Sequence, residues 1–351
     1  MMPMHSGPVR FLAQKARAGL GLALDIDAAC VEKQVLCPAE PGTVEPAIHF
    51  PDHLDRLTGT FSTFGLENEI AKITRREIEH TETAAFLFKD ARLYAGSAFA
   101  GRYRHYLRPP KSPLGGGFRE FRSAALVSSA AGLQFFGHWL ADDMPRCDLA
   151  TEDQAKICLP VGDWKDFEIY CRLLDREFLE VENAFFDELT IFRDLSQNSL
   201  RRKRYDILRG RLRSRVKPDG DGEIIYFSRG RTGVDRIIEN ESELIEALQR
   251  EGIRHISLEH DSTEAILAAL HGARIVITVE GSQQKHCLFS LPDKAALLLI
   301  QPPKRFMLLM KGFADCLGWP FGFVVGEDRG EEFHVYPGEV LKMVDELQKR
   351  L

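Results

Sequence analysis

The chain is predicted to be an α/β protein built from two doubly wound domains that face one cleft. Its 351 residues are too many for one ordinary core, and two domains of roughly 150 residues each are expected. Its C-terminal half alternates short apolar runs with helical patterns. Those apolar runs are too continuous for a sheet with one face in water, so they predict a parallel sheet covered on both faces.

The composition is that of a globular protein, with 44% hydrophobic and 28% charged residues. The formal net charge of −6 argues against a nucleic-acid-binding protein, because binding to phosphates favours a basic face. One basic run, 201–204, lies in a helical pattern and is expected to be a solvent-exposed helix face. The seven cysteines contain no CxxC pair, which predicts reduced thiols rather than a disulfide framework or a zinc site.

The N-terminus carries basic residues before the apolar stretch 19–24, a pattern that superficially resembles a signal peptide. Asp25 and Asp27 interrupt the pattern before Cys30, and the apolar run is short. We therefore expect a cytoplasmic protein. No run approaches the roughly 18 apolar residues of a membrane span, so any membrane association would be peripheral, at the inner face.

The first half is predicted to contain an irregular segment, 1–83, joined to a first α/β domain, 84–215. Apolar alternation and helical spacing define its elements. The predicted elements are a hairpin over 84–96 with its turn near Lys89-Asp90, strands at 124–129, 156–162 and 189–192, and helices at 135–150, 163–180 and 197–214.

The second domain is predicted over 216–336, after a Pro/Gly-rich linker at 216–222. Asn240 and Ser262 are candidate helix N-caps, and Gly252 is a stop signal. The predicted strands are 223–230, 254–260, 273–279 and 295–301, and the predicted helices are 240–252, 262–272 and 282–291.

The C-terminal segment 337–351 is predicted to be a helix. It has Val340, Met343, Val344 and Leu347 on one face. We expect this helix to cross back and brace the first domain.

Polar residues follow two of the predicted strands, where ligands bind in open parallel sheets. Arg229 and its neighbour Ser228 end one strand, and the stretch Glu280 to Gln283 ends another. Gly281 permits a tight turn or a close backbone approach, and Ser282 can cap the next helix.

An arginine at a strand end can grip phosphate oxygens with two parallel hydrogen bonds. Together, Arg229 and the 280–283 turn suit a nucleotide diphosphate, although capped strand-to-helix turns of this kind are also common as plain structure. The chain has neither a GxGxxG nor a GxxxxGK[ST] motif, so the standard dinucleotide and P-loop signatures are absent.

Three stretches, FFGHWLADDMPRCDL (135–149), IIYFSRGRTGVDRIIENESELIEAL (224–248) and ARIVITVEGSQQKHCLF (273–289), resemble glycosyltransferase family 61. The resemblance is to bacterial members of capsular or exopolysaccharide synthesis, and runs from about 85 to 325. It implies two Rossmann-like domains in the GT-B arrangement, with the donor nucleotide in the C-terminal domain. It also implies inverting transfer without an obligatory metal, and a nucleotide-sugar co-substrate. Glu280 stands where many members have a histidine.

Inverting transfer needs a base for the acceptor hydroxyl and a positive environment for the departing diphosphate. Given the resemblance, His138 is the expected base. Asp142 lies on the same helical face and could orient His138 or act as the base itself, and Asp143 is a third candidate. The alternatives are a histidine that packs and acids that answer the helix dipole.

Further candidates surround the donor. Arg146, Arg231 and His286 could reach it, with packing roles as the alternative for Arg146 and His286. Glu280 can accept hydrogen bonds from ribose or sugar hydroxyls. Arg236 is expected to pair with Glu241 or Glu243. The DxD sequence at 219–221 is expected to be a solvated turn, and Trp139 and Trp319 are expected to be core.

The predicted function is an inverting, metal-independent glycosyltransferase. It would move a sugar from a nucleotide-sugar to a glycan or lipid-linked glycan acceptor in bacterial surface-polysaccharide synthesis. One alternative is a non-catalytic glycan- or nucleotide-binding relative, which the replaced loop histidine makes conceivable. Another is a different nucleotide-dependent enzyme on two such domains, such as a sugar-nucleotide epimerase.

Overall fold

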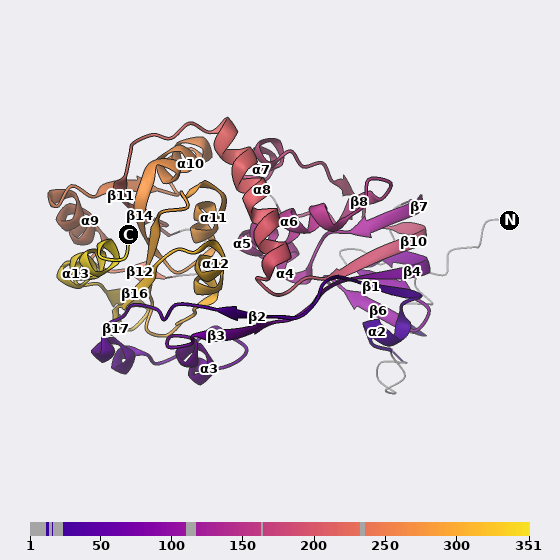
Figure 1. The fold of residues 1–351 in the computed structure, drawn as a ribbon, viewed down its shortest axis with the longest axis horizontal. Helices are drawn as coiled ribbons and strands as arrows, with labels where there is room; N and C mark the ends of the chain where they lie inside the picture. The colour runs from indigo at the N-terminus through magenta and orange to yellow at the C-terminus, as the bar shows by residue number, and fades with distance from the viewer. Residues whose placement is uncertain (1–11, 14–15, 17–23, 110–116, 163, 232–235) are drawn as a thin grey trace. The chain divides into compact units, whose positions relative to one another are not determined.

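The structure, a computed structural model, describes residues 12–13, 16, 24–109, 117–162, 164–231 and 236–351. The chain divides into two compact units (Figure 1). The first comprises 1–39 and 81–196, and the second comprises 40–80 and 197–351. The predicted boundaries are therefore wrong in three places. Segment 40–80 and the helix before residue 216 belong to the second unit, and the predicted linker 216–222 lies inside that unit.

The first unit is built on an eight-stranded mixed sheet of order β6-β5-β4-β10-β7-β8-β9, with β1 also paired to β4. β10, β7, β8 and β9 are parallel neighbours, whereas β1, β4, β5 and β6 pair in antiparallel fashion. Only half of this sheet has the predicted parallel character, so the doubly wound prediction is wrong for this unit. The strands are β1 (Glu32–Cys37), β4 (Thr83–Tyr94), β5 (Ser97–Ala100), β6 (Tyr103–Tyr106), β7 (Arg119–Leu126), β8 (Ala155–Cys158), β9 (Leu179–Glu180) and β10 (Ala184–Arg193).

The hairpin turn predicted at Lys89-Asp90 lies elsewhere. β4 continues through Asp90, which has φ 51°, and the turn to β5 is made by Ala95 and Gly96, with φ of 49° and 71°. Two successive residues with positive φ are what a tight hairpin requires. Asp90 instead marks an irregularity that lets one long strand keep the same face in the core.

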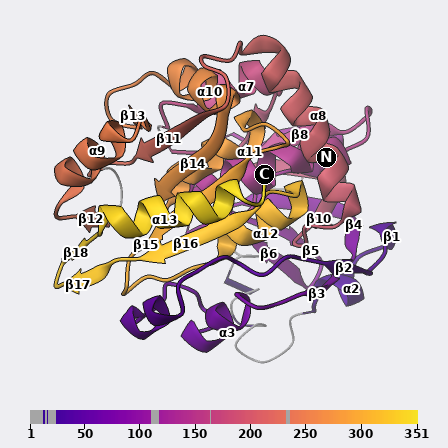
Figure 2. The same ribbon diagram turned by 60° about the vertical axis from the view of Figure 1, so that its left-hand side comes forward.

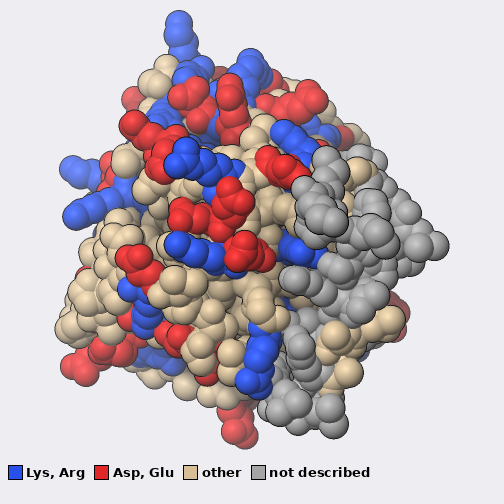
Figure 3. Space-filling model, turned by 90° about the vertical axis from the view of Figure 1, so that its right-hand side faces the viewer, with Lys and Arg blue, Asp and Glu red and all other residues tan. Residues whose placement is uncertain are grey.

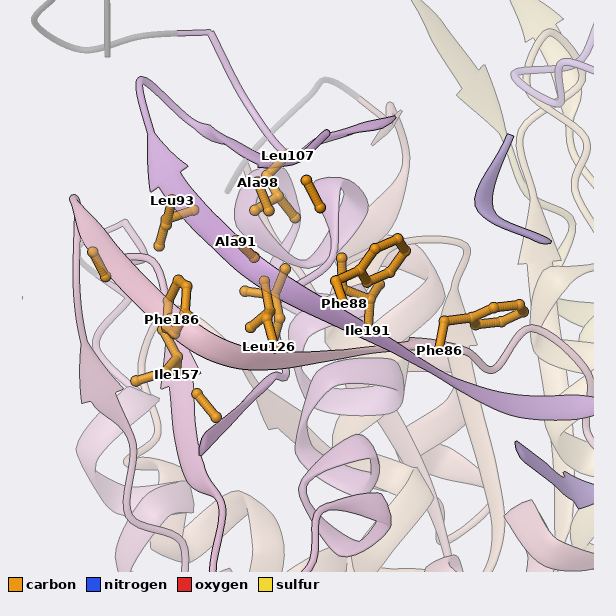
Figure 4. Close-up of a cluster of buried hydrophobic side chains, with 14 of the residues drawn as sticks. Phe86, Phe88, Ala91, Leu93, Ala98, Leu107, Leu126, Ile157, Phe186 and Ile191 are labelled. Atoms are coloured by element: carbon orange, nitrogen blue, oxygen red, sulfur yellow. The ribbon is translucent and has the colours of Figure 1, made fainter. Parts of the chain in front are cut away.

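The core of the first unit shows the effect of that irregularity. Before Asp90 the buried side chains of β4 are Phe86 and Phe88, and after it they are Ala91 and Leu93. Strand side chains alternate between faces, so a change from even to odd numbers requires a local kink of this kind. Figure 4 shows these side chains gathered with those of the neighbouring strands.

The second unit has a five-stranded, all-parallel sheet of order β13-β11-β14-β15-β16. In chain order this is 2-1-3-4-5, a doubly wound topology, so the predicted parallel sheet is confirmed for this unit. The strands are β11 (Glu223–Ser228), β13 (Arg254–Ser257), β14 (Ala273–Val279), β15 (Ala296–Gln301) and β16 (Phe321–Val325).

Helices cover both faces of this sheet, as predicted. In Figure 1, α9 (Glu241–Arg250) and α13 (Pro337–Gln348) lie on one side, and α10 (Thr263–Gly272), α11 (His286–Ser290) and α12 (Leu309–Leu317) lie on the other. The Ser262 side chain accepts a hydrogen bond from the Ala265 N–H, so the predicted cap of α10 is present. Asn240 occupies the predicted cap position of α9 but makes no side-chain cap bond.

Helix α13 packs on the sheet of the second unit. Figure 2 shows it lying across β15 and β16. Its apolar face, Val340, Met343, Val344 and Leu347, is buried in the same core as Val324. That face is buried within the second unit, and the bracing of the first domain by this helix stays a prediction.

Segment 40–80, predicted as part of the first domain, covers the β16 edge of the second sheet. Ile48 forms a parallel bridge with Gly322, and His53 Nδ1 accepts a hydrogen bond from the Val325 N–H at 3.0 Å. Covering an edge strand satisfies its exposed backbone groups. The segment contains β2 (Glu40–Thr43), η1 (Pro51–Arg56), α3 (Leu66–Ala71) and β3 (Glu77–His80).

The basic helix α8 (Ser199–Arg215) is not simply a solvent-exposed face. Lys203 is exposed, but Arg201, Arg204 and Arg209 are buried. The Arg209 guanidinium donates to the carbonyl oxygens of residues 288 and 291, at 2.7 and 2.8 Å, where α11 ends. Cationic side chains stabilise the free carbonyls at a helix C-terminus, so part of this basic helix stabilises the interior of the second unit.

The surface and the cysteines complete the description. In the part of the chain that the structure describes, no helix is long and apolar enough to cross a membrane. None of the seven cysteines is part of a disulfide, in agreement with the prediction. On the face drawn in Figure 3, basic and acidic side chains are interspersed rather than separated by sign. The signal-like stretch before Leu24 falls largely outside the described residues.

Candidate functional site

The strand order of the second unit identifies where a ligand would bind. In a 2-1-3-4-5 sheet the switch point lies between the first and third strands, here β11 and β14, at their carboxyl ends. Arg229 follows β11, Glu280 follows β14, and Arg305 follows the neighbouring strand β15. The two strand ends singled out in the sequence therefore flank the switch point.

Arg229 and the turn after β14 are in close contact. The Arg229 side chain is buried, and a Cβ placed on Gly281 would lie 3.3 Å from its Nη1 and would overlap the Gln283 side-chain oxygen. The Gly281 backbone has φ 156° and ψ 178°, a conformation that is essentially restricted to glycine. This is the close backbone approach predicted for Gly281.

Glu280 is the centre of an arginine cluster. Its Oε2 lies 2.6 Å from Nε of Arg236, and the two side chains are only 8% and 11% exposed. Arg305 is near both: burial lowers the pKa of Arg305, Arg236 lowers it further, and Glu280 opposes the shift. With Arg229 beside Gly281, three guanidinium groups lie around the Glu280-Gly281 turn. This excess of positive charge suits an anion.

The pairing predicted for Arg236 is wrong. Glu241 instead accepts a hydrogen bond from the Tyr226 hydroxyl at 2.7 Å. Burial raises the pKa of Glu241, and this hydrogen bond opposes the shift.

Three of the predicted donor residues make contacts that serve the fold. Ser228 Oγ is 2.8 Å from Nε2 of His255, between β11 and β13. The Gln283 amide donates to the Val279 carbonyl oxygen at 2.6 Å. His286 is buried, with its ring edge-on to Phe227. These contacts place all three side chains among the supports of the β11 and β14 ends.

Ser282 and Arg231 are exposed. Ser282 opens the short 3-10 turn η4 (Ser282–Lys285), but Gly281 holds the cap position and no side-chain cap bond is formed. The predicted Ser282 cap is therefore wrong. The Arg231 backbone N–H donates to Glu259 at 2.8 Å.

His138 and Asp142 form the predicted pair in the first unit. Helix α5 (Phe136–His138) runs into a π-helical turn, η2 (Trp139–Asp143), a feature that often marks functional sites. Nδ1 of His138 lies 2.8 Å from Oδ2 of Asp142, and the side chains are 32% and 22% exposed. With Nδ1–H donating to the carboxylate, Nε2 is left to accept a proton.

Asp143 and Arg146 lie in the core of the first unit. Asp143 Oδ1 is 2.7 Å from Nη1 of Arg146, and its Oδ2 accepts from the Ser129 N–H at 3.1 Å. Arg146 also donates to the Val127 carbonyl oxygen. Burial raises the pKa of Asp143 to about 6 against the opposing effects of Arg146 and Ser129. These contacts tie the end of β7 to the helical turn, which is the packing alternative for Arg146 and separates Asp143 from the candidate bases.

Trp139 and Trp319 lie in the core, and residues 219–221 form an exposed turn, as predicted. Trp139 is buried, and its ring centroid lies 5.0 Å from that of Phe167. Trp319 is also buried, with the Arg209 guanidinium over its ring. Asp219 lies in an exposed turn and pairs with Arg254 at 2.6 Å. Among the described residues, no group of three or more His, Cys, Asp or Glu side chains could hold a metal ion.

Two members of the arginine cluster, Arg236 and Arg305, were not predicted as site residues. A signal for Arg305 exists in the sequence, because it follows the predicted strand 295–301 by four positions and so lies at the same edge as the other strand ends. Arg236 carries no such signal, since its partner Glu280 lies in a distant part of the chain.

Comparison with known families supports the predicted class. The family model described as Glycosyltransferase 61 matches residues 136–298. This span holds the three motifs except for one residue, and is shorter than the range of 85–325 over which the resemblance was expected. The match identifies the chain as a glycosyltransferase. The family that it supports is glycosyltransferase family 61.

Two solved structures with detectable similarity are those of TibC. One is the dodecameric iron-containing heptosyltransferase in complex with ADP-D-beta-D-heptose, with 9% identity and a TM-score of 0.32. The other is the glycosyltransferase TibC from enterotoxigenic E. coli H10407, with 8% identity and a TM-score of 0.34. Each alignment covers 77% of this chain and 94% of that chain. TM-scores this low carry no argument. No curated protein sequence matches the chain.

Proposed function

We propose that the protein is an inverting, metal-independent glycosyltransferase. It moves a hexosyl or pentosyl unit from a nucleotide-sugar to a hydroxyl of a bacterial surface-polysaccharide precursor. The observation that carries this proposal is the arginine cluster of Arg229, Arg236 and Arg305 around the Glu280-Gly281 turn. Guanidinium groups bind the oxygens of a diphosphate in a planar, bidentate manner, and a nucleoside-diphosphate sugar carries such a group.

The chemistry that we propose is a single displacement. The acceptor oxygen attacks the anomeric carbon, the bond from that carbon to the phosphate oxygen breaks, and the nucleoside diphosphate leaves with the electron pair. Negative charge develops on the leaving phosphate, where preorganised positive groups stabilise a transition state most. The arginine cluster can supply that charge without a metal ion.

We propose His138 as the base that takes the acceptor proton. Asp142 contacts Nδ1 of the imidazole at 2.8 Å, which leaves Nε2 to face the acceptor. A base within reach of the acceptor hydroxyl accelerates such a transfer. In this proposal the two units act as the domains of a GT-B enzyme. The donor binds the second unit and the acceptor binds the first, in the cytoplasm or at the inner face of the membrane.

The test is nucleotide release from UDP-, GDP-, CMP- and dTDP-sugars, with and without EDTA, measured together with binding. We expect His138→Ala to lose turnover but retain nucleotide binding, and Arg229→Ala to lose binding. Arg250→Ala is the control, because this arginine is exposed at the end of α9 in the same unit and has no proposed role. Binding without turnover for every donor and acceptor would favour a non-catalytic relative instead.

A further inference from the structure

An exposed aromatic ring from a distant part of the chain lies next to Arg305 of the arginine cluster. The Arg305 guanidinium carbon lies 4.3 Å from the centroid of the Phe61 ring, and Phe61 is 53% exposed. Phe61 belongs to segment 40–80, which the structure places on the second unit. Glu280 and Arg236 act electrostatically on Arg305, so the ring lies at the rim of the candidate anion site.

The backbone on the N-terminal side of Phe61 is fixed against the loop after β15. The Thr58 and Gly59 N–H groups donate to the Pro303 carbonyl oxygen at 2.9 and 3.2 Å, and the Phe306 N–H donates to the Gly59 carbonyl oxygen at 3.0 Å. A Cβ on Gly59 would lie 2.7 Å from the Lys304 carbonyl oxygen. Only glycine allows so close an approach.

The hydroxyl of Thr60 adds a further tie. It donates to the Phe306 carbonyl oxygen at 2.7 Å and accepts from the Ser62 N–H at 2.9 Å. Phe61 is therefore held between two anchored residues, and its exposed ring is not the tip of a loosely attached loop.

Arg305 has capacity left for a ligand. Within the described ranges it forms no ion pair, and its buried Nε has no hydrogen-bond partner. Buried polar groups in proteins are nearly always hydrogen-bonded, so the described residues leave part of the hydrogen-bonding capacity of this guanidinium unused, beside an exposed ring.

We infer that Phe61 is the stacking surface for the base of the donor nucleotide, with Arg305 binding the adjoining phosphate. This inference rests on the proposed function and names a part of that same site. A nucleoside diphosphate joins an anionic group to a flat aromatic base, and the protein offers guanidinium groups next to a fixed aromatic face. Stacking on a phenyl ring accepts any base, because every base has a π face.

The experiment measures calorimetric binding of UDP, GDP, CDP and dTDP, and separately of inorganic pyrophosphate, which has the charge but no base. For Phe61→Ala we expect about tenfold weaker binding of the preferred nucleoside diphosphate and unchanged binding of pyrophosphate. Phe64→Ala is the matched control, because Phe64 lies three residues further on and is 73% exposed. It should leave both affinities unchanged.

Tryptophan replacements give a second readout that does not depend on loss of affinity. In Phe61→Trp, the preferred nucleoside diphosphate should quench the new fluorescence and pyrophosphate should not, whereas Phe64→Trp should respond to neither. Equal nucleotide affinity in wild type and Phe61→Ala would overturn the inference and leave the proposed function standing. Equal weakening of nucleotide and pyrophosphate would also overturn it, because Phe61 would then only support Arg305. No nucleotide binding by the wild type would remove both proposals.

Discussion

Arg236 and Glu280 form a nearly buried ion pair, with 2.6 Å between Nε and Oε2, at the point where β14 ends. Arg236 lies just before β12 (Ile237–Ile238), so the pair links two segments that no local pattern brings together. Glu280 stands where many members of the resembled family have a histidine. Its partner accounts for a carboxylate at this position, since a buried charge requires one of opposite sign.

Arg236→Met is expected to lower the free energy of unfolding by about 3–5 kcal/mol, because it leaves the Glu280 carboxylate buried without this partner. The double variant Arg236→Met/Glu280→Leu should lose less than the sum of the two single changes, since it removes both charges. Urea denaturation followed by circular dichroism measures all three variants. Strictly additive losses would show that the two side chains are not energetically coupled.

Arg209→Lys in α8 is expected to destabilise the protein by about 2–4 kcal/mol. An ammonium group cannot reproduce the hydrogen bonds that the guanidinium makes to residues 288, 291 and 293. Lys203→Ala, on the exposed side of the same helix, should change stability by less than about 0.5 kcal/mol. Thermal melting of the two variants side by side tests the contrast, and similar losses would contradict a buried role for Arg209.

The second sheet could be predicted because its signals are local. Each strand is a continuous apolar run, and most of its helices begin or end at polar caps and glycines within a few residues. The first sheet depends on distant pairing. β4 continues past Asp90 because it pairs with β10, about a hundred residues later, whereas the local sequence around Asp90 reads as a turn. The bridge from Ile48 to Gly322 is equally non-local. No local sequence pattern therefore indicated that segment 40–80 belongs to the second unit.

In the candidate site, too, local sequence signals predicted some residues, whereas the roles of others depend on distant contacts. The strand-end rule found Arg229, Glu280 and Gly281 because the rule needs only the position of each strand along the chain. It did not assign the roles of Ser228 and Gln283, whose partners are His255 on a neighbouring strand and a carbonyl of the preceding one. Composition likewise could not distinguish Arg209 from Lys203, because the difference lies in the carbonyl groups that α11 presents to α8.

Asp143 is expected to make stability pH-dependent. Its folded pKa of about 6 lies above its ordinary value of 3.8, so the folded state holds this proton more tightly. The contribution of Asp143 is fully present below about pH 4 and is lost as the pH rises towards 6, a decrease of roughly 3 kcal/mol. The measurement is the free energy of unfolding from pH 4 to 6.5 for wild type and Asp143→Asn.

Asparagine does not titrate, so the difference between the two proteins isolates the carboxyl group. The variant will be less stable at neutral pH, because Arg146 loses its charged partner, but its pH profile should be flatter in this window. Parallel profiles would mean that Asp143 stays ionised throughout.

Asp142→Asn tests the division of labour with His138. If Asp142 orients the imidazole, this variant should reduce kcat by about 10- to 100-fold and leave the KM for the nucleotide-sugar unchanged. His138→Gln should then be nearly inactive. Substantial activity in His138→Gln, together with complete loss in Asp142→Asn, would make Asp142 the base. Steady-state kinetics with the donor identified in the screen decides between the two.

Gly281→Ala should weaken nucleotide binding more than it weakens the fold. The new methyl group would overlap the Gln283 side chain and press on Arg229 Nη1 from 3.3 Å, while the backbone keeps a conformation that alanine rarely adopts. The turn must shift, and the guanidinium with it, so we expect at least a roughly tenfold loss of affinity for the nucleoside diphosphate, about 1.4 kcal/mol.

Gly312→Ala is the matched control: a Cβ there meets nothing within 4 Å and sits inside α12, where alanine is favoured by about 0.5–1 kcal/mol. It should raise the melting temperature slightly and leave binding intact. Unchanged affinity in Gly281→Ala would show that the turn after β14 does not set the position of Arg229, and the phosphate site would then have to be sought elsewhere on the second unit.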